Sequence, residues 1–170
     1  MISPNAIDST VVLTIPMRAE YVSIARLTAA GVANRLGFDI ETIEDIKVSL
    51  SEVCNRIIST QDKFAEGYNA ECKIKFILSR DSLGIDFYVD NMGMLEYFAP
   101  DGASSHADIC AAGFSIDNDK LLNDVQAHGD RPIEEYYKDQ LQLSLITLLM
   151  DEFVVHPKES CLVSMKKYLD

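Results

Sequence analysis

Long hydrophobic runs are missing from this sequence of 170 residues. No apolar stretch approaches the ~20 residues that a membrane-spanning helix needs. The first five residues form neither the basic nor the apolar part of a signal peptide. The sequence therefore predicts a soluble protein with a cytoplasmic location and no membrane contact.

Cysteine and histidine are scarce. The four cysteines form no C-x-x-C pair, and the three histidines show no metal-ligand spacing. This pattern argues against a disulfide framework and against a structural zinc site. We therefore expect reduced thiols in a reducing compartment and assign no metal ligands.

Basic residues are also few. Fifteen lysines and arginines stand against 27 acidic residues, for a net charge of −12, and no local basic patch is evident. Such a chain is repelled by a nucleic-acid backbone, so we expect no nucleic-acid partner. Residues 101–139 contain nine acidic and three basic residues and so supply −6 of this charge.

The remaining patterns predict one α+β domain spanning residues 1–170. Strands are expected at 10–15, 72–78, 84–89, 153–156 and 160–168, and helices at 20–36, 40–60 and 134–150. Because the strands come in hairpins, we expect a two-layer α/β sandwich: a mixed, mostly antiparallel sheet with helices on one face. An irregular, lid-like insert at about 92–132 contains at most one short helix near 119–126.

The two N-terminal helices have recognisable ends and faces. Gly37 suits the end of the first, and Asp39 can cap the second. In the first helix a rough helical spacing, typical of a core-facing side, is kept by Tyr21, Ile24, Leu27, Val32 and Leu36. In the second, one buried face is predicted for Ile43, Ile46, Leu50, Val53, Cys54, Ile57 and Ile58. Other faces are expected for Glu44, Lys47, Ser51 and Arg56.

Three local patterns bear on function. They lie at residues 44–56 on the second helix, at 89–93 after a strand, and at 145–153 where a helix meets the last hairpin. Each alone has a structural explanation: an exposed helix carboxylate, an ordinary turn, or core filling. Only their combination indicates a function.

Together, in this order, the patterns resemble the anti-sigma-factor serine-protein kinases, a branch of the GHKL ATPases with the Bergerat fold. Residues 15–28 resemble the family's first strand and helix, and residues 43–52 resemble its second helix. Residues 149–152 and 163–169 resemble its end. The resemblance covers nearly the whole chain except the insert.

This resemblance implies that Glu52 is the catalytic base. The family has an asparagine four residues later, on the same helix face, which holds the Mg²⁺ of ATP. Here that position is Arg56, which can contact a phosphate but cannot ligate a metal. Asn55 lies about 100° round the helix from that position.

The family's next motif is Asp-x-Gly, whose aspartate accepts a hydrogen bond from adenine. Aligning on Gly93 places Asn91 at the aspartate position, and Asp90 is offset by one residue. An asparagine oxygen can still accept this bond. Asp90 would face the other way unless a bulge re-aims it.

The family's last motif is a glycine-rich turn whose backbone binds phosphate. Its glycine positions fall on Asp139, Gln140 and Gln142. Bulky side chains are unsuited to a turn that needs close approach and positive φ. We expect Arg56, Gln140 and Gln142 to fill the space beside Glu52.

Two interpretations follow from the resemblance. The first is a regulatory protein that binds a sigma factor or an anti-anti-sigma antagonist in a partner-switching pathway, with a degenerate site that binds ATP weakly or not at all. A homodimer is also implied. The second is an active kinase that uses ATP and Mg²⁺ to phosphorylate the antagonist, with Glu52 as base and metal ligation through Asn55.

The insert adds further alternatives. Its acidic stretch, 101–139, is either a partner-binding loop or a surface loop without function. A new small-molecule site there would use residues 104–106 and Cys110, but adjacent serine and histidine do not supply triad geometry.

Overall fold

The computed structural model describes residues 9–61, 70–90, 142–143, 145–156 and 161–169. Its helices are α1 (Ala19–Leu36) and α2 (Ile40–Gln61). Its strands are β1 (Ser9–Pro16), β2 (Glu71–Leu78), β3 (Ser82–Val89), β4 (Glu152–Val155) and β5 (Cys161–Tyr168). Residues 142–143 and 145–149 are also helical. The two helices and five strands agree with the sequence prediction to within two residues. The insert, the helix near 119–126 and the first part of the helix predicted at 134–150 lie outside the described residues.

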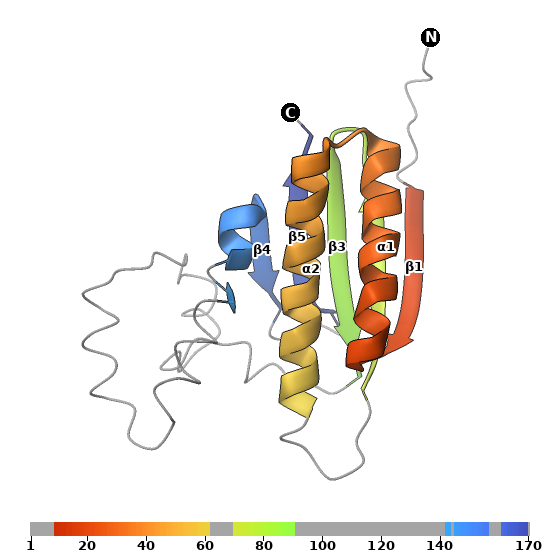
Figure 1. The fold of residues 1–170 in the computed structure, drawn as a ribbon, viewed down its shortest axis with the longest axis vertical. Helices are drawn as coiled ribbons and strands as arrows, with labels where there is room; N and C mark the ends of the chain where they lie inside the picture. Colours follow the sequence, from red (N-terminus) through yellow and green to blue (C-terminus); the bar gives the residue numbers. More distant parts are fainter. Residues whose placement is uncertain (1–8, 62–69, 91–141, 144, 157–160, 170) are drawn as a thin grey trace, which may run out of the picture.

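The strands form one sheet in the order β1-β2-β3-β5-β4 (Figure 1). Every described strand pair is antiparallel. The prediction of a mostly antiparallel sheet is therefore confirmed, and its expected parallel component is not seen among the described strands. The register between β3 and β5 shifts once, between Phe87 and Tyr88.

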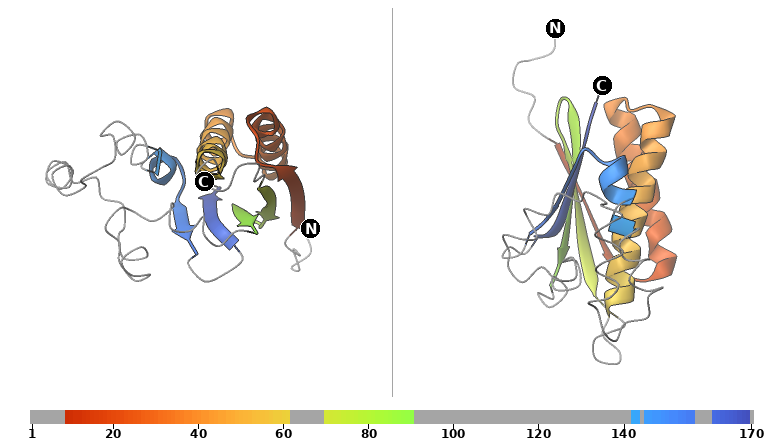
Figure 2. Two further views of the ribbon diagram at one scale, coloured as in Figure 1. Left: turned by 90° about the horizontal axis from the view of Figure 1, so that it is seen from below. Right: turned by 90° about the vertical axis from the view of Figure 1, so that its left-hand side faces the viewer.

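Both long helices lie on one face of this sheet, as Figure 2 shows in two directions. The predicted two-layer α/β sandwich is thus confirmed. On the opposite face no described helix covers the strands. No helix within the described ranges is long and apolar enough to cross a membrane.

The core lies between the helices and the sheet. On α2 it includes Ile46, Leu50, Val53, Cys54 and Ile57, as the sequence predicted. The strands contribute alternate residues, among them Ile74, Phe76, Ile85, Phe87, Val163 and Met165. Alternation on β2 and β3 therefore separates a helix-facing side from a helix-free side.

The buried side of α1 differs from the prediction. Ile24 and Leu27 are exposed, whereas Ala25, Ala29, Val32 and Ala33 are buried. Small alanines allow α1 to approach its neighbours closely, so the large apolar residues do not mark its core-facing side. The prediction was therefore wrong for Ile24 and Leu27, whereas Val32 is buried and Tyr21 and Leu36 pack against the core as partly buried residues.

The connection between the helices follows local chemistry. Gly37 ends α1 in the left-handed region at φ 93°, which glycine adopts without steric cost. Asp39 then accepts a 2.7 Å hydrogen bond from the Thr42 backbone N–H at the start of α2. That bond lowers the pKa of Asp39. Both predicted helix-end residues are confirmed.

Candidate functional site

The candidate site begins on the second half of α2. Glu52 is half-buried, Asn55 is exposed, and Arg56 is buried, with 5% of its surface accessible. Since residues four apart lie on the same side of a helix, Glu52 and Arg56 are neighbours there. Asn55 lies about 100° round the helix from Arg56, as its position in the sequence predicted.

The burial of Arg56 corrects a prediction. Arg56 and Ser51 were expected on faces away from the core, and both are buried. Buried positions on α2 cover about 220° of its circumference, counted at 100° per residue. Figures 1 and 2 show why: α2 lies between α1 and the helical residues 142–143 and 145–149, on one face of the sheet.

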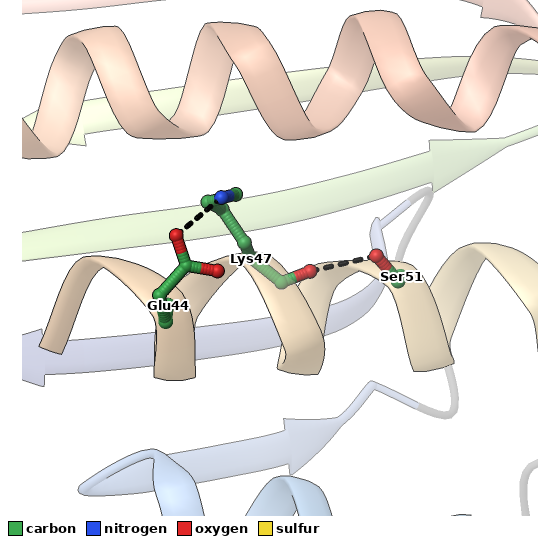
Figure 3. Close-up of polar contacts among 3 residues, drawn as sticks. All are labelled: Glu44, Lys47 and Ser51. Atoms are coloured by element: carbon green, nitrogen blue, oxygen red, sulfur yellow. Dashed lines mark hydrogen bonds and ion pairs between the residues drawn. The ribbon is translucent and has the colours of Figure 1, made fainter. Parts of the chain in front are cut away.

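The polar residues before Glu52 serve the helix itself (Figure 3). Lys47 and Glu44 form an ion pair with 2.5 Å between Nζ and Oε1. The Ser51 hydroxyl donates a 2.7 Å hydrogen bond to the Lys47 carbonyl oxygen. This local bond satisfies the Ser51 hydroxyl and lets it be buried beside Glu52 without a distant partner.

The remaining predicted site residues are only partly described. Asp90 is exposed directly after β3, and Gln142 is half-buried in the helical residues near the end of the insert. Asn91, Gly93 and Gln140 lie outside the described residues. The structure therefore places Glu52 and Arg56 one turn apart on α2, with Asn55 exposed about 100° round the helix from Arg56. It leaves the adenine and glycine-turn positions as predictions.

Arg56, the residue four positions after Glu52, cannot serve as a ligand of a magnesium ion. Mg²⁺ requires oxygen ligands in near-octahedral geometry, and the neighbouring position is occupied by a guanidinium that carries no acceptor. In the part of the chain that the structure describes, no three histidine, cysteine or acidic side chains form a metal-binding group. A second cation at this position would also be repelled by Arg56.

A polar cluster that the sequence did not reveal lies on the helix-free side of the sheet. Ser164 on β5 donates a 2.7 Å hydrogen bond to Asp86 on β3, and His156 Nε2 lies 2.8 Å from the same hydroxyl. Since the serine proton goes to Asp86, His156 is the donor to Ser164. A catalytic triad needs the histidine to accept the serine proton, so this arrangement is a cross-strand network.

Comparison with known proteins finds relatives that share one name. No family model matches the chain. Proteins named serine-protein kinase RsbW, from Bacillus cereus strains B4264 and Q1, are 35% identical to it over 158 residues. The same holds for a protein of that name from Bacillus thuringiensis subsp. konkukian strain 97-27. Each alignment covers 92% of this chain and 83% of the relative.

Proposed function

This chain belongs to the anti-sigma-factor serine-protein kinase family of the GHKL ATPases, and we propose that it regulates by binding proteins. We propose further that it does so without phosphoryl transfer. Its proposed partners are a sigma factor and the anti-anti-sigma antagonist that competes for it. Both encounters would occur in the cytoplasm. The function would then depend on competition between protein surfaces, with the nucleotide site degenerate.

One observation carries this proposal: the buried Arg56 one helical turn after Glu52. A guanidinium is always charged and only donates hydrogen bonds. It cannot take over the role of a metal-binding amide oxygen, and its burial keeps it among the packed residues of α2. The base position is thus retained while the adjoining metal position is lost.

The residues near the end of the insert support the same proposal. Gln142 stands where the family has a glycine of the phosphate-binding turn, and it is half-buried. A glutamine side chain occupies space that the phosphate would need. The sequence places Asp139 and Gln140 at the other two glycine positions. Restoring asparagine at position 56 alone should therefore not restore nucleotide binding.

Calorimetry with ATP and Mg²⁺ tests the degenerate site directly. We expect no heat of binding with nucleotide at ~1 mM, a concentration that would reveal even a weak complex. One of the Bacillus serine-protein kinase relatives serves as positive control. A micromolar dissociation constant for this chain would overturn the proposal.

Partner binding is tested with purified sigma factors and anti-anti-sigma proteins from the source organism. We expect at least one pair to bind the wild-type chain, and Glu52→Ala to leave that affinity unchanged because no phosphoryl transfer is required. Biolayer interferometry without nucleotide measures both. If neither protein class binds, the regulatory role is wrong.

The second candidate function is an active kinase. It is favoured by the partial exposure of Glu52 and the exposure of Asn55, which leave both side chains reachable from solvent. In that case radiolabelled phosphate from ATP would appear on a serine of the antagonist, and Glu52→Ala would abolish it. This outcome would replace the binding-only proposal.

A further inference from the structure

Two lysines of β2 lie on the side of the sheet that the described helices leave uncovered (Figure 2). Burial alternates along β2, so Lys73 and Lys75 point away from the core to which Ile74 and Phe76 contribute. Lys73 is exposed and Lys75 is half-buried. Residues two apart on a strand are about 7 Å apart. Within the described part of the chain neither lysine forms an ion pair, so together they make a local positive centre on a chain of net charge −12.

The acidic residues beside this centre are engaged elsewhere or lie at its margin. Asp86 is opposite Lys75 on β3, and its two carboxylate oxygens accept hydrogen bonds from Ser164 and Tyr88. Glu71 is the first residue of β2 and precedes Lys73 by two positions. No described carboxylate is therefore bound to either ammonium group, and both can receive a carboxylate from another molecule.

Next to the lysines, the same side of the sheet lacks a side chain at Gly84. This residue lies inside β3, opposite Ile77 on β2 and Lys166 on β5. The three atoms nearest to a Cβ built there all belong to Ile77, at 3.5 to 3.9 Å. The Lys166 ammonium lies 4.7 Å from the centroid of the Tyr168 ring and so extends along β5. Glycine inside a strand allows another chain to approach closely, and Ile77 gives this position an apolar wall.

We propose that this lysine face (Lys73, Lys75, Ile77 and Gly84) binds an acidic segment of a partner protein. Carboxylates of the segment would bind Lys73 and Lys75, and one apolar side chain would lie over Gly84 against Ile77. The assignment rests on the proposed function, which requires protein partners, and it names the surface and the chemistry of the segment that binds there.

Spacing and charge both favour such a segment. Carboxylates two residues apart in an extended segment have the same separation of about 7 Å as the two lysines. Gly84 is the diagonal cross-strand neighbour of Lys75, at about 7 to 8 Å, so an apolar residue of the same segment can reach it. Because the chain carries a net charge of −12, it repels an acidic partner over most of its surface. Electrostatic complementarity therefore directs the segment to the lysine face.

The first test uses the full chain and the partner protein that binds it in the interferometry assay. Lys73→Glu should raise the dissociation constant at least ~tenfold, because an attraction becomes a repulsion. Arg80→Glu makes the same change of charge at an exposed residue between β2 and β3, outside the lysine face, and should change the constant by less than about twofold. Equal effects of the two variants, or no effect of either, overturn the lysine face and leave the proposed function intact. If no partner protein binds the wild type, both fail.

A second variant tests the apolar position. An alanine Cβ at Gly84 makes ordinary van der Waals contact with Ile77, so Gly84→Ala should fold with wild-type stability. It should nevertheless weaken partner binding at least ~threefold, because the methyl group takes space that the apolar side chain of the segment needs. Circular dichroism and interferometry measure the two properties. An unchanged affinity would overturn the placement of an apolar side chain over Gly84.

The acidic residues 101–139 of this chain are the competing occupant, because they have the same charge as the proposed segment. A synthetic peptide of these residues, added to the complex, separates the two cases. We expect it to displace the partner no better than a scrambled peptide of the same composition. If it displaces the partner specifically, and binds the wild type more tightly than Lys73→Glu, the lysine face serves the chain's own segment and the proposal is overturned.

Discussion

The Ser164 hydroxyl donates a 2.7 Å hydrogen bond to the Asp86 carboxylate across the β3–β5 pair, where the two residues are directly opposite each other. His156 extends this contact to the end of β4, and the Tyr88 hydroxyl lies 3.4 Å from the other carboxylate oxygen. The network thus joins three segments on the side of the sheet that the described helices leave uncovered. It stabilises the C-terminal half of the sheet.

Replacing Ser164 with alanine should lower the free energy of unfolding by about 1 to 2 kcal/mol, because a half-buried carboxylate loses a charge-assisted hydrogen bond. Ser23→Ala is the matched control: its exposed hydroxyl bonds only to the Glu20 carbonyl oxygen within α1, and a change below about 0.5 kcal/mol is expected. Urea denaturation followed by circular dichroism measures both, since the chain has no tryptophan. Equal effects of the two variants would mean that the network contributes nothing.

A second prediction concerns Gln61 at the end of α2. Its buried side-chain amide donates to the Met17 carbonyl oxygen at 2.5 Å and accepts from the Ala70 backbone N–H at 3.0 Å. Gln61→Ala would leave both backbone groups buried without this partner, at a cost of about 2 to 4 kcal/mol. The exposed amide of Asn55 on the same helix provides the control, and Asn55→Ala should change the stability by less than about 0.5 kcal/mol. A Gln61→Ala protein as stable as wild type would contradict this assignment.

Cys54 leads to a third prediction, about reactivity and pH. Burial raises the pKa of the Cys54 thiol from its ordinary 9.0 to about 12. Because the thiolate is the reactive form, the native protein should not be alkylated at Cys54 at pH 8, whereas the urea-unfolded protein should be. Peptide mass spectrometry after iodoacetamide treatment measures both. Rapid alkylation of the native protein would contradict the burial.

The raised pKa of Cys54 also predicts how the stability of the protein depends on pH. The thiol stays neutral in the folded state, so its contribution is fully present below pH 9 and is lost as the pH rises towards 12. Between these two pH values, ionisation of the thiol in the unfolded state lowers the free energy of unfolding by about 1 kcal/mol per pH unit. Cys54→Ala should therefore reduce the alkaline slope of stability, in urea titrations at about pH 8 and about pH 10. An unchanged slope would show that Cys54 does not cause it.

Most of the fold could be predicted because its signals are local. Period-two alternation identified the β2–β3 and β4–β5 hairpins, and Gly37 and Asp39 marked the junction between the helices. The buried side of α1 could be found only in part this way, because three of its four buried residues are alanines and the large apolar residues Ile24 and Leu27 are exposed. Close packing between helices determines which side of α1 faces the core, and side-chain hydrophobicity alone does not predict it.

The candidate site was predictable only along α2. The relation of Glu52 to Arg56 follows from helical spacing, but the burial of Arg56 depends on the neighbours that flank α2 on both sides. The contact between Asp86 and Ser164 could not be predicted from the sequence, for another reason. These residues are 78 positions apart, and only the pairing of β3 with β5 brings them together. Register between distant strands is a tertiary property that neither strand encodes alone.

Replacing glycine with alanine should have opposite effects on stability at two positions, Gly37 and Gly31. Gly37 has φ 93°, where an alanine Cβ is strained, so Gly37→Ala should destabilise the protein by about 1 kcal/mol. Gly31 lies inside α1 in ordinary helical conformation, and the position that an alanine methyl group would take is open space. Gly31→Ala should therefore stabilise by about 0.5 to 1 kcal/mol through the lower backbone entropy of the unfolded chain. Thermal and urea unfolding at a single protein concentration compare the two variants directly. If both changed stability in the same direction, the left-handed end of α1 at Gly37 would be wrong.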